Sequence, residues 1–328
     1  MDRIIGMGNA LTDVLATLKD DALLARMELP KGSMQLIDAD KLQLINDEFA
    51  RMETQLATGG SACNTIRGLA ALGTPTGFIG KVGTDRYGKF YRENLLHYHI
   101  ADKMLTGDLP SGVASTFISP DGERTFGTYL GAAATLRAED LTPEMFKDYA
   151  CLYIEGYLVQ DHEMIERAMI LAKEEGLQVC LDLASYNIVE AEREFFHKLM
   201  EKYVDIVFAN EEEARAFTGE APEMAVESLS KLCSIAIVKV GAHGSYIRKG
   251  TQSLHVPALH IQQVTDTTGA GDYFAAGFLF GLVEGCSLDK CAAVGSLLAG
   301  NVIQVVGAHL PDSRWSEIKA HVTNMLHS

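Results

Sequence analysis

The sequence predicts a three-layer α/β/α fold, in which a mostly parallel sheet has helices on both faces and a small inserted β-sheet forms a lid. Short runs rich in Val, Ile and Leu alternate with amphipathic segments over most of the 328 residues. These runs are almost continuously apolar, as expected for parallel strands that are covered on both sides. Two segments, 27–37 and 112–131, break the alternation with short patterns punctuated by Pro and Gly.

The elements of the main layers are expected where the hydrophobic periodicity switches between the strand and the helix pattern. Amphipathic stretches at 161–175 and 190–202 predict helices, and the C-terminal part predicts two long apolar helices at 271–284 and 288–305. The main-sheet strands are expected at residues 3–8, 77–81, 151–155, 178–183, 204–209 and 235–240.

The second of the two irregular segments predicts a β-hairpin, with strands at 113–118 and 124–130 around the turn Ser119-Pro-Asp-Gly122. A few isolated strands cannot build a core of their own. We therefore expect residues 27–37 and 112–131 to form a small β lid over a crevice at the strand ends. The α/β core is then made of residues 1–26, 38–111 and 132–328.

Composition narrows the class of function. The net charge of -16 argues against a nucleic-acid surface, which needs an excess of Lys and Arg. No apolar run suggests a membrane span, and the N-terminus lacks the basic start and uninterrupted apolar core of a signal peptide. The six cysteines are scattered without a C-x-x-C pair, so reduced thiols are expected. These features favour an acidic cytoplasmic enzyme that acts on a small molecule.

The strongest motif is Asp266-Thr-Thr-Gly-Ala-Gly-Asp272, directly before an apolar helical pattern. Gly269 and Gly271 let the backbone approach a ligand, and the N–H groups of Ala270, Gly271 and Asp272 are expected to be unpaired at the helix start. Such a terminus binds anions and stabilises a phosphoryl group during transfer. Asp272 beside it can accept the proton of an attacking hydroxyl, although an Asp here also suits a plain helix cap.

This motif resembles the signature of the ribokinase-like (PfkB) carbohydrate kinases, and the resemblance extends over residues 3–311. It implies a ribokinase-like body with a β lid that binds nucleotide and substrate, with ATP and Mg2+ as cofactors. It also implies Asp272 as the catalytic base and the backbone of residues 269–272 as an anion hole. A Walker A loop is excluded, because Lys and Ser or Thr would have to follow the last Gly. A homodimer through the lid is a further expectation.

Two N-terminal segments are expected to bind the sugar or nucleoside acceptor. Gly59-Gly60-Ser61 opens an apolar helix, where the glycines permit close approach and Asn64 offers a donor and an acceptor, although a plain glycine turn capped by Ser61 is the alternative. The resemblance implies that Asn9 and Asp13, after the first strand, serve the acceptor, with Asp13 binding paired hydroxyls; an ordinary loop acid is the alternative. Leu11 stands where a dinucleotide fingerprint needs its third Gly, which disfavours a nicotinamide oxidoreductase.

The resemblance places the nucleotide near two further segments. Asn210 and Glu213 match the N-x-x-E element that organises Mg2+ through water, and the same two residues also suit a helix N-cap. Lys239, Gly241 and Gly244 match the strand-to-glycine turn that borders ATP in the family. A solvated Lys239 is the alternative to a phosphate contact.

Three residues are expected to complete the phosphate site. Arg124 follows the lid turn and is expected to close over the γ-phosphate, with a solvated hairpin base as the alternative. Asp266 and Thr268 match positions that hold a monovalent cation such as K+ in several family members. A cation site at these positions would also require carbonyl groups from the loop at Gly307.

Within the family, the adenosine kinase-like branch is the most similar, because of the segments around Asp13, Gly59-Gly60-Ser61 and 153–158. The expected reaction is in-line transfer of phosphate from ATP to the hydroxymethyl group of adenosine. A free-sugar kinase of the ribokinase or fructokinase type is the alternative. A non-catalytic ligand sensor is disfavoured, because Asp272 and the glycines are retained. The lid residues expected to contact a purine are Met34, Leu36, Phe117 and Leu130.

Overall fold

The computed structural model describes residues 2–327 and confirms the α/β fold with a large, mostly parallel sheet. The strand order of this nine-stranded sheet is β16-β15-β14-β13-β12-β11-β1-β5-β7. The strands from β14 to β7 pair in parallel, and β15 and β16 are added antiparallel at one edge. The strands are β1 (Ile4–Met7), β5 (Thr76–Ile79), β7 (Ile100–Asp102), β11 (Cys151–Glu155), β12 (Gln178–Asp182), β13 (Ile206–Asn210), β14 (Ile235–Lys239), β15 (Ser245–Lys249) and β16 (Gln252–Val256).

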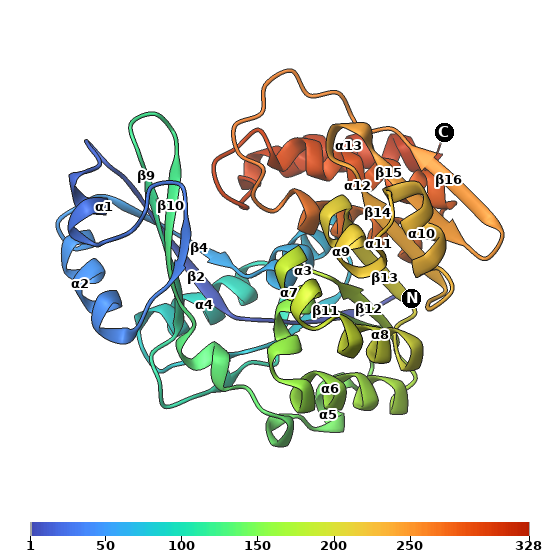
Figure 1. Ribbon diagram of the computed structural model, residues 1–328, viewed down its shortest axis with the longest axis horizontal. Helices are drawn as coiled ribbons and strands as arrows, with labels where there is room; N and C mark the ends of the chain where they lie inside the picture. Colours follow the sequence, from blue (N-terminus) through green and yellow to red (C-terminus); the bar gives the residue numbers. More distant parts are fainter. Residues whose placement is uncertain (1, 328) are drawn as a thin grey trace.

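Helices cover both faces of this sheet, because successive strand residues point to opposite sides (Figure 1). Cys151 and Ile235 pack with α3, α4, α11, α12 and α13, whereas their neighbours Leu152 and Ala236 pack with the helices from α5 to α10. The helices of these two layers are α3 (Ser61–Leu72), α4 (Arg86–His97), α5 (Pro143–Phe146), α6 (His162–Glu174), α7 (Tyr186–Ala191), α8 (Arg193–Lys202), α9 (Glu211–Thr218), α10 (Pro222–Leu229), α11 (Ala270–Val283), α12 (Leu288–Val302) and α13 (Asp312–His327).

Most predicted elements are present with ends shifted by a few residues. The predicted helix at 190–202 is divided, because α7 ends at Ala191 and α8 begins at Arg193. A short two-stranded sheet consists of β6 (Lys81–Val82), which follows β5 in sequence, and β8 (Leu105–Thr106), which follows β7. No helix within residues 2–327 combines the length and the hydropathy needed to span a bilayer.

A second, five-stranded sheet has the order β3-β10-β9-β2-β4 and carries α1 and α2; Figure 1 shows it standing at one end of the body. The predicted lid segments contribute β3, β9 and β10. The sheet contains more strands than those segments supply. Strand β2 begins only four residues after β1 and pairs with both β9 and β4, so β2 and β4 also belong to the small sheet. The homodimer expected through this lid stays a prediction, which sedimentation velocity would test. Its elements are β2 (Leu11–Thr17), α1 (Ala22–Arg26), β3 (Met34–Leu36), α2 (Ala39–Phe49), β4 (Thr54–Gly59), β9 (Gly112–Ile118) and β10 (Arg124–Tyr129).

The two faces of the small sheet have different roles. Val14 and Phe117 point into a hydrophobic cluster under α1 and α2, where the Phe117 ring lies 5.0 Å from that of Phe49. Leu15 and Asp13 alternate with these residues and point to the opposite face. Phe117 is fully buried, so the expectation that it contacts a purine is wrong: strand parity turns it into the lid core.

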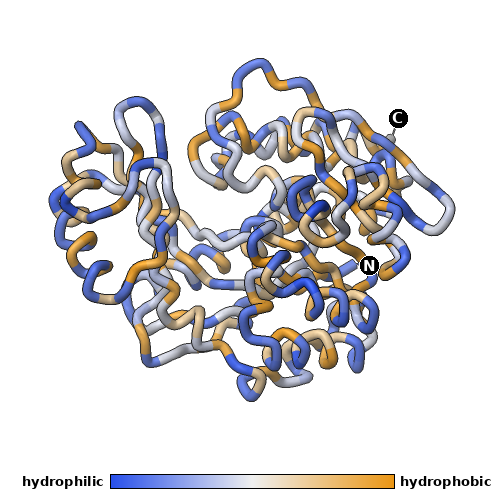
Figure 2. Tube along the Cα trace, in the orientation of Figure 1, coloured by the Kyte–Doolittle hydropathy of each residue, from blue (hydrophilic) through white to orange (hydrophobic). Residues whose placement is uncertain are grey.

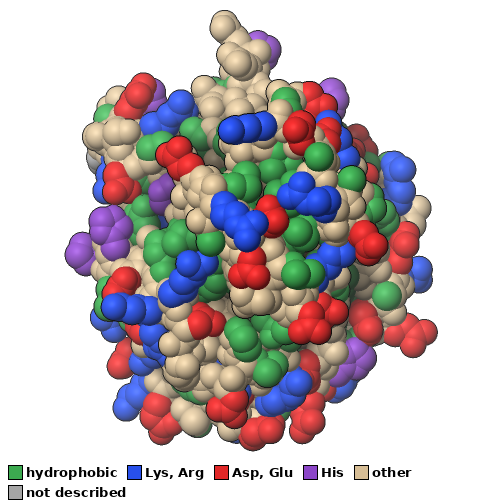
Figure 3. Space-filling view, turned by 90° about the vertical axis from the view of Figure 1, so that its left-hand side faces the viewer, with side chains coloured by type: hydrophobic (Ala, Val, Ile, Leu, Met, Phe, Trp, Pro, Cys, Tyr) green, Lys and Arg blue, Asp and Glu red, His purple; other side chains and the backbone are tan. Residues whose placement is uncertain are grey.

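Hydropathy follows this architecture. Figure 2 shows hydrophobic residues along the central strands and a hydrophilic tip of the β9–β10 hairpin. Figure 3, which views the molecule from the lid side, shows hydrophobic patches interrupted by side chains of both charges.

Candidate active site

Charged and polar residues gather where the parallel strands of the main sheet end. The last residues of β11, β12, β13 and β14 are Glu155, Asp182, Asn210 and Lys239. The carboxyl ends of parallel strands lie at one edge of a sheet, and ligands of open α/β sheets bind there. The structure therefore brings together segments that are separated in sequence at the edge where α3 and α11 also begin.

The start of α11 has the geometry of an anion site. Gly269 is its N-cap with φ of 77°, and a Cβ there would lie 2.6 Å from the Ala308 Cβ. Neither the Gly271 nor the Asp272 N–H group has an acceptor within residues 2–327. The Ala270 N–H group, expected to be free, instead donates to the Thr267 carbonyl at 3.1 Å. The tight turn that precedes the helix uses this donor, so the free amides are those of Gly271 and Asp272.

The Asp272 carboxylate is held from α3. Ser61 Oγ donates to Oδ1 at 2.7 Å, and Asn64 Nδ2 donates to Oδ2 at 2.8 Å. Thr65 Oγ1 donates to the Asp272 carbonyl at 3.1 Å. Burial raises the pKa of Asp272 to about 6, against the lowering effect of the hydrogen bonds from Asn64 and Ser61. Ser61 and Asn64, expected at the acceptor, thus orient an acid that is mostly ionised at pH 7 and basic enough to take a proton.

Glu155 organises the neighbouring loop and was not predicted as a site residue. Its Oε1 accepts from the backbone N–H and the Nδ2 of Asn9, at 2.9 and 3.0 Å, and its Oε2 accepts from the Ala62 N–H at 2.9 Å. The side chain is 1% exposed, and burial raises its pKa to about 7. Asn9 is therefore fixed to the sheet, and the start of α3 is fixed to the same carboxylate.

Asp13 lies on the face of the small sheet opposite α1 and α2, with Ala57 and Ala114 as its neighbours on β4 and β9. Its carboxylate accepts no hydrogen bond from any residue in 2–327. Burial raises the pKa of Asp13 to about 7, while Arg67 and Arg124 act to lower it. An unpaired, partly desolvated carboxylate suits a ligand that brings hydroxyl donors.

The two glycines before α3 are required by close contacts. A Cβ at Gly59 would lie 2.4 Å from Asp13 Oδ1, and a Cβ at Gly60 would lie 2.2 Å from the Asn9 carbonyl oxygen. Gly60 also has φ of 92°, in the region that glycine adopts readily. These glycines keep the space around Asp13 and Asn9 open.

A second cluster lies beside the anion site. Lys239 Nζ donates to Asp182 Oδ2 at 2.9 Å, and a Cβ at Gly271 would lie 3.1 Å from the same Nζ. The ammonium group therefore lies near the free amides of α11. Asp182 carries no sequence motif that distinguishes it from other acids at strand ends, and its role was not predicted. Burial, and then the charge of Asp182, raise the pKa of Glu213 to about 7.

The Asn210–Glu213 pair forms the N-cap of α9, the structural role that the sequence also allowed beside a role in Mg2+ binding. The Asn210 N–H and Nδ2 each donate to Glu213 at 2.7 Å, and Glu213 N–H donates back to Asn210 Oδ1 at 2.8 Å. Glu213 is 3% exposed. Within residues 2–327, no group of three or more His, Cys, Asp or Glu side chains is arranged to hold a metal ion directly.

The glycine turn after β14 contains two residues with left-handed backbone. Gly241 and Gly244 have φ of 57° and 99°, and a Cβ at Gly244 would lie 2.0 Å from the Val256 carbonyl oxygen. Around Gly241 a Cβ would meet no atom within 4 Å, so the backbone here is open to a ligand.

Arg124 has a different partner from the predicted phosphate. It contacts the Asp266 carboxylate, and its Nη1 donates to Thr268 Oγ1 at 2.9 Å. The same carboxylate accepts from the N–H groups of Thr268, at 3.0 Å, and Gly307, at 2.6 Å. Asp266 is thus occupied by donors on both oxygens, and the Arg124 guanidinium already supplies a positive charge where K+ was expected. A monovalent cation does not fit this arrangement.

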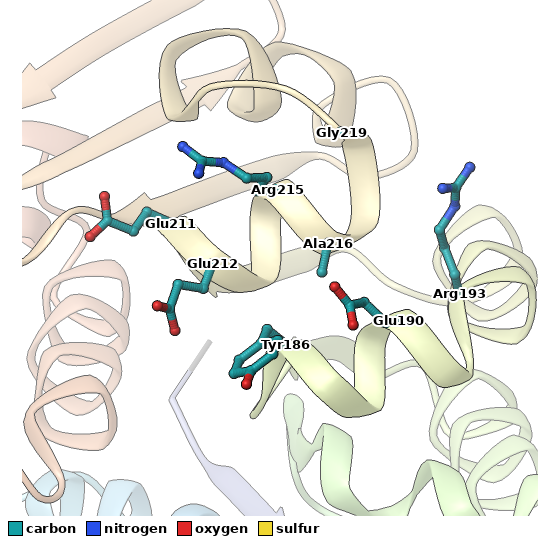
Figure 4. Close-up of a pocket in the computed structure, with 8 residues that line it drawn as sticks. All are labelled: Tyr186, Glu190, Arg193, Glu211, Glu212, Arg215, Ala216 and Gly219. Carbon is teal, nitrogen blue, oxygen red and sulfur yellow. The ribbon is translucent and has the colours of Figure 1, made fainter.

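A pocket of about 690 Å3 lies to one side of these groups. Figure 4 shows its residues on α7, on α9 and the turn that follows α9, and at the start of α8, with Tyr186 and Glu212 near each other and Arg193 on the opposite side. The lining, drawn from the described residues, includes neither Asp272 nor Asp13. It is therefore distinct from the acceptor site.

The open face of the lid supplies apolar surface. Met34 and Leu36 on β3 stand opposite Phe126 and Thr128 on β10, so they share the face that carries Asp13. Met34 is 59% and Leu36 65% exposed, high values for apolar side chains. A planar, partly apolar ligand group would cover this surface.

Comparisons with known proteins agree with these observations. Residues 32–315 match the family described as pfkB family carbohydrate kinase. Adenosine kinase from Saccharomyces cerevisiae is 29% identical over 96% of this chain and 99% of its own length. The crystal structure of adenosine kinase from Sinorhizobium meliloti is 36% identical, with a TM-score of 0.84 over 97% of this chain and 98% of that one. A probable sugar kinase from Rhizobium etli is 34% identical, with a TM-score of 0.85 over 98% of both chains.

Proposed function

The chain belongs to the pfkB family of carbohydrate kinases, and we propose that its acceptor is adenosine, phosphorylated on the 5′-hydroxymethyl group. Membership makes the chain an ATP-dependent kinase of a sugar or a nucleoside. Two of the relatives described above, from yeast and from Sinorhizobium meliloti, are adenosine kinases that align with almost the whole chain. Their names support adenosine as the acceptor.

The observation that carries the proposal is the arrangement of Asp272 beside the free amides of α11. The carboxylate takes the proton of the attacking hydroxyl, while the Gly271 and Asp272 N–H groups donate to the oxygens of the transferring phosphoryl group. Lys239 lies close enough to the same amides to add positive charge. Ser61 and Asn64 hold the base in the orientation that the attack requires.

On the acceptor side, Asp13 receives the hydroxyl groups of the ribose, because its carboxylate has two free acceptor oxygens. Gly59 and Gly60 leave room for the sugar next to it. The adenine ring of the acceptor then lies against the apolar lid face at Met34 and Leu36, where burial of the purine removes exposed apolar surface.

On the nucleotide side, the open backbone at Gly241 borders ATP, and Gly244 permits the tight turn beside it. Asp182 is hydrogen-bonded to Lys239 and lies close enough to Glu213 to raise its pKa, so two acids lie beside the phosphate site, and carboxylates suit a hydrated Mg2+ ion. Asp182 and Glu213 would hold the ion through its water ligands. When bound, Mg2+ supplies charge neutralisation on the phosphate oxygens.

An acceptor panel tests the proposal. The purified chain is incubated with ATP and Mg2+ and with adenosine, inosine, ribose or fructose, and the phosphorylated product is identified by chromatography. We expect adenosine to give AMP with the highest kcat/KM. A free-sugar kinase is the second candidate, favoured by the similarity to the probable sugar kinase from Rhizobium etli. Turnover of ribose or fructose without turnover of nucleosides would establish that candidate instead.

A further inference from the structure

Arg67 is a buried arginine in the second turn of α3, and the proposed reaction gives it no contact with substrate. Its exposure is 2%, and it is among the largest fully buried side chains. A buried guanidinium is costly unless its donors are paired. Among the described residues, no ion pair joins Arg67 to a carboxylate. Salt-bridge stabilisation therefore does not explain its position.

The donors of Arg67 are satisfied by neutral acceptors from four parts of the fold. Nη1 donates to the Thr58 carbonyl at 2.8 Å and to Thr58 Oγ1 at 2.9 Å, at the end of β4. Nη2 donates to Asn64 Oδ1 at 3.2 Å and to the Tyr273 hydroxyl at 3.5 Å, and it also contacts the Ala308 carbonyl. The guanidinium thus joins the small sheet, α3, α11 and the loop after α12.

The contact with Asn64 determines which way its amide faces. Because Oδ1 of Asn64 accepts from Arg67, Nδ2 is left to donate to Asp272 Oδ2. A rotated amide would present a donor to Arg67 and an acceptor to the carboxylate, and both contacts would be repulsive. Without Arg67, only the contact with Asp272 is left to determine the orientation of the Asn64 amide.

We propose that Arg67 is a positioning residue of the phosphoryl-transfer site, which orients Asp272 through the Asn64 amide. This inference rests on the proposed function, because it requires Asp272 to be the base. The competing explanation is that Arg67 only ties elements together. The two explanations differ in kinetics: a positioning role acts on kcat through Asn64, whereas a structural role acts on stability alone.

A double-mutant cycle of Arg67→Lys and Asn64→Ala separates them. We measure kcat, KM for ATP, KM for the acceptor and the midpoint of thermal unfolding, Tm. Lysine keeps the charge but not the fork of donors. We expect each single variant to lower kcat roughly 10-fold to 10²-fold, the range for a misplaced catalytic group, with KM for ATP unchanged. The double variant should fall no more than about twofold below Asn64→Ala, because both changes act on one contact.

Arg92→Lys is the matched control. Arg92 on α4 donates twice to Asp102 and once to the Met104 carbonyl, away from the site. The same substitution there should change Tm without changing kcat. If Arg67→Lys does not fold, Arg67→Gln replaces it in the cycle, since it removes a buried charge and keeps one donor nitrogen.

Two outcomes overturn the inference: losses in kcat that multiply in the double variant, or an Arg67 variant that changes Tm alone. Asp272→Asn, measured in parallel, keeps this failure distinct from failure of the proposed function. If Asp272→Asn retains turnover, the base itself is misassigned. If Asp272→Asn is inactive while the cycle is additive, only the role of Arg67 is wrong.

Discussion

The site of the base, Asp272, and the open face of the lid differ in two respects: whether their carboxylates already accept hydrogen bonds, and whether their apolar side chains are already buried. Both carboxylate oxygens of Asp272 accept hydrogen bonds from α3. Asp13 has no such partner within residues 2–327, and Met34 and Leu36 beside it are largely exposed. The phosphoryl-transfer half is thus assembled without ligand, whereas the acceptor half obtains its partners from the ligand. Under the proposed function, the acceptor supplies partners to Asp13 while the base needs no rearrangement.

The largest effect is expected at the assembled half. Asp272→Asn keeps the size of the side chain but removes the base, so kcat should fall about 10³-fold, within the range for a general base. The affinity for ATP, measured by calorimetry, should stay the same, because the free amides and Lys239 remain. Turnover close to that of the unmodified chain would show that the well-ordered acid has only a structural role.

The next largest effect is expected at the open half. Asp13→Ala removes two hydrogen bonds between ribose hydroxyls and a charged group, which contribute ~1.5–3 kcal/mol each, so kcat/KM for adenosine should fall about 10²-fold to 10⁴-fold. 2′-Deoxyadenosine is the matched ligand, since it lacks one of the paired hydroxyls. The unmodified chain should discriminate against it, and the variant should not. Equal discrimination by both would mean that Asp13 is not the ribose contact.

The pH dependence of kcat sharpens the comparison further. A base must be deprotonated to act, and the pKa of Asp272 is raised to about 6 by burial. We therefore expect kcat to be level above that pH and to fall as the pH decreases through it. Ser61→Ala removes a hydrogen bond that lowers this pKa, so the midpoint should move to higher pH, and the loss of kcat should be larger at pH 6 than at pH 8, where only the poorer orientation of the base remains. A midpoint that moves to lower pH would contradict the assignment.

The smallest effect is expected for monovalent cations. Arg124 occupies Asp266 and Thr268, and Asp266 also accepts from the Gly307 N–H group. Replacing K+ by tetramethylammonium in the assay should leave kcat unchanged. Activation by K+ would show that the lid arginine leaves Asp266 during turnover and that the carboxylate then accepts a cation.

Local signals account for most of the fold and for the base. The glycines and the apolar pattern after Asp266 predict both the start of α11 and the acid beside it, because a helix terminus is encoded within a few residues. Alternation also marks β2, where the buried Val14 and the half-buried Asp13 point to opposite faces. Reading this period would have placed β2 in the small sheet rather than in the core.

The missed residues have roles that only long-range contacts create. Glu155 bonds with Asn9 across 146 residues, and Arg67 bonds with Ala308 across 241. Neither has a flanking pattern that separates it from an ordinary acid or base. Phe117 was misjudged for a related reason: the face that a strand residue occupies depends on the pairing register, and a shift of one residue reverses it.

The hydrogen bond between Ser61 and Asp272 joins residues 211 positions apart. During synthesis, which runs from the N-terminus, α3 leaves the ribosome long before α11 exists. The nascent chain therefore has the Asp13 side of the acceptor site early but has no base until its final third docks on α3.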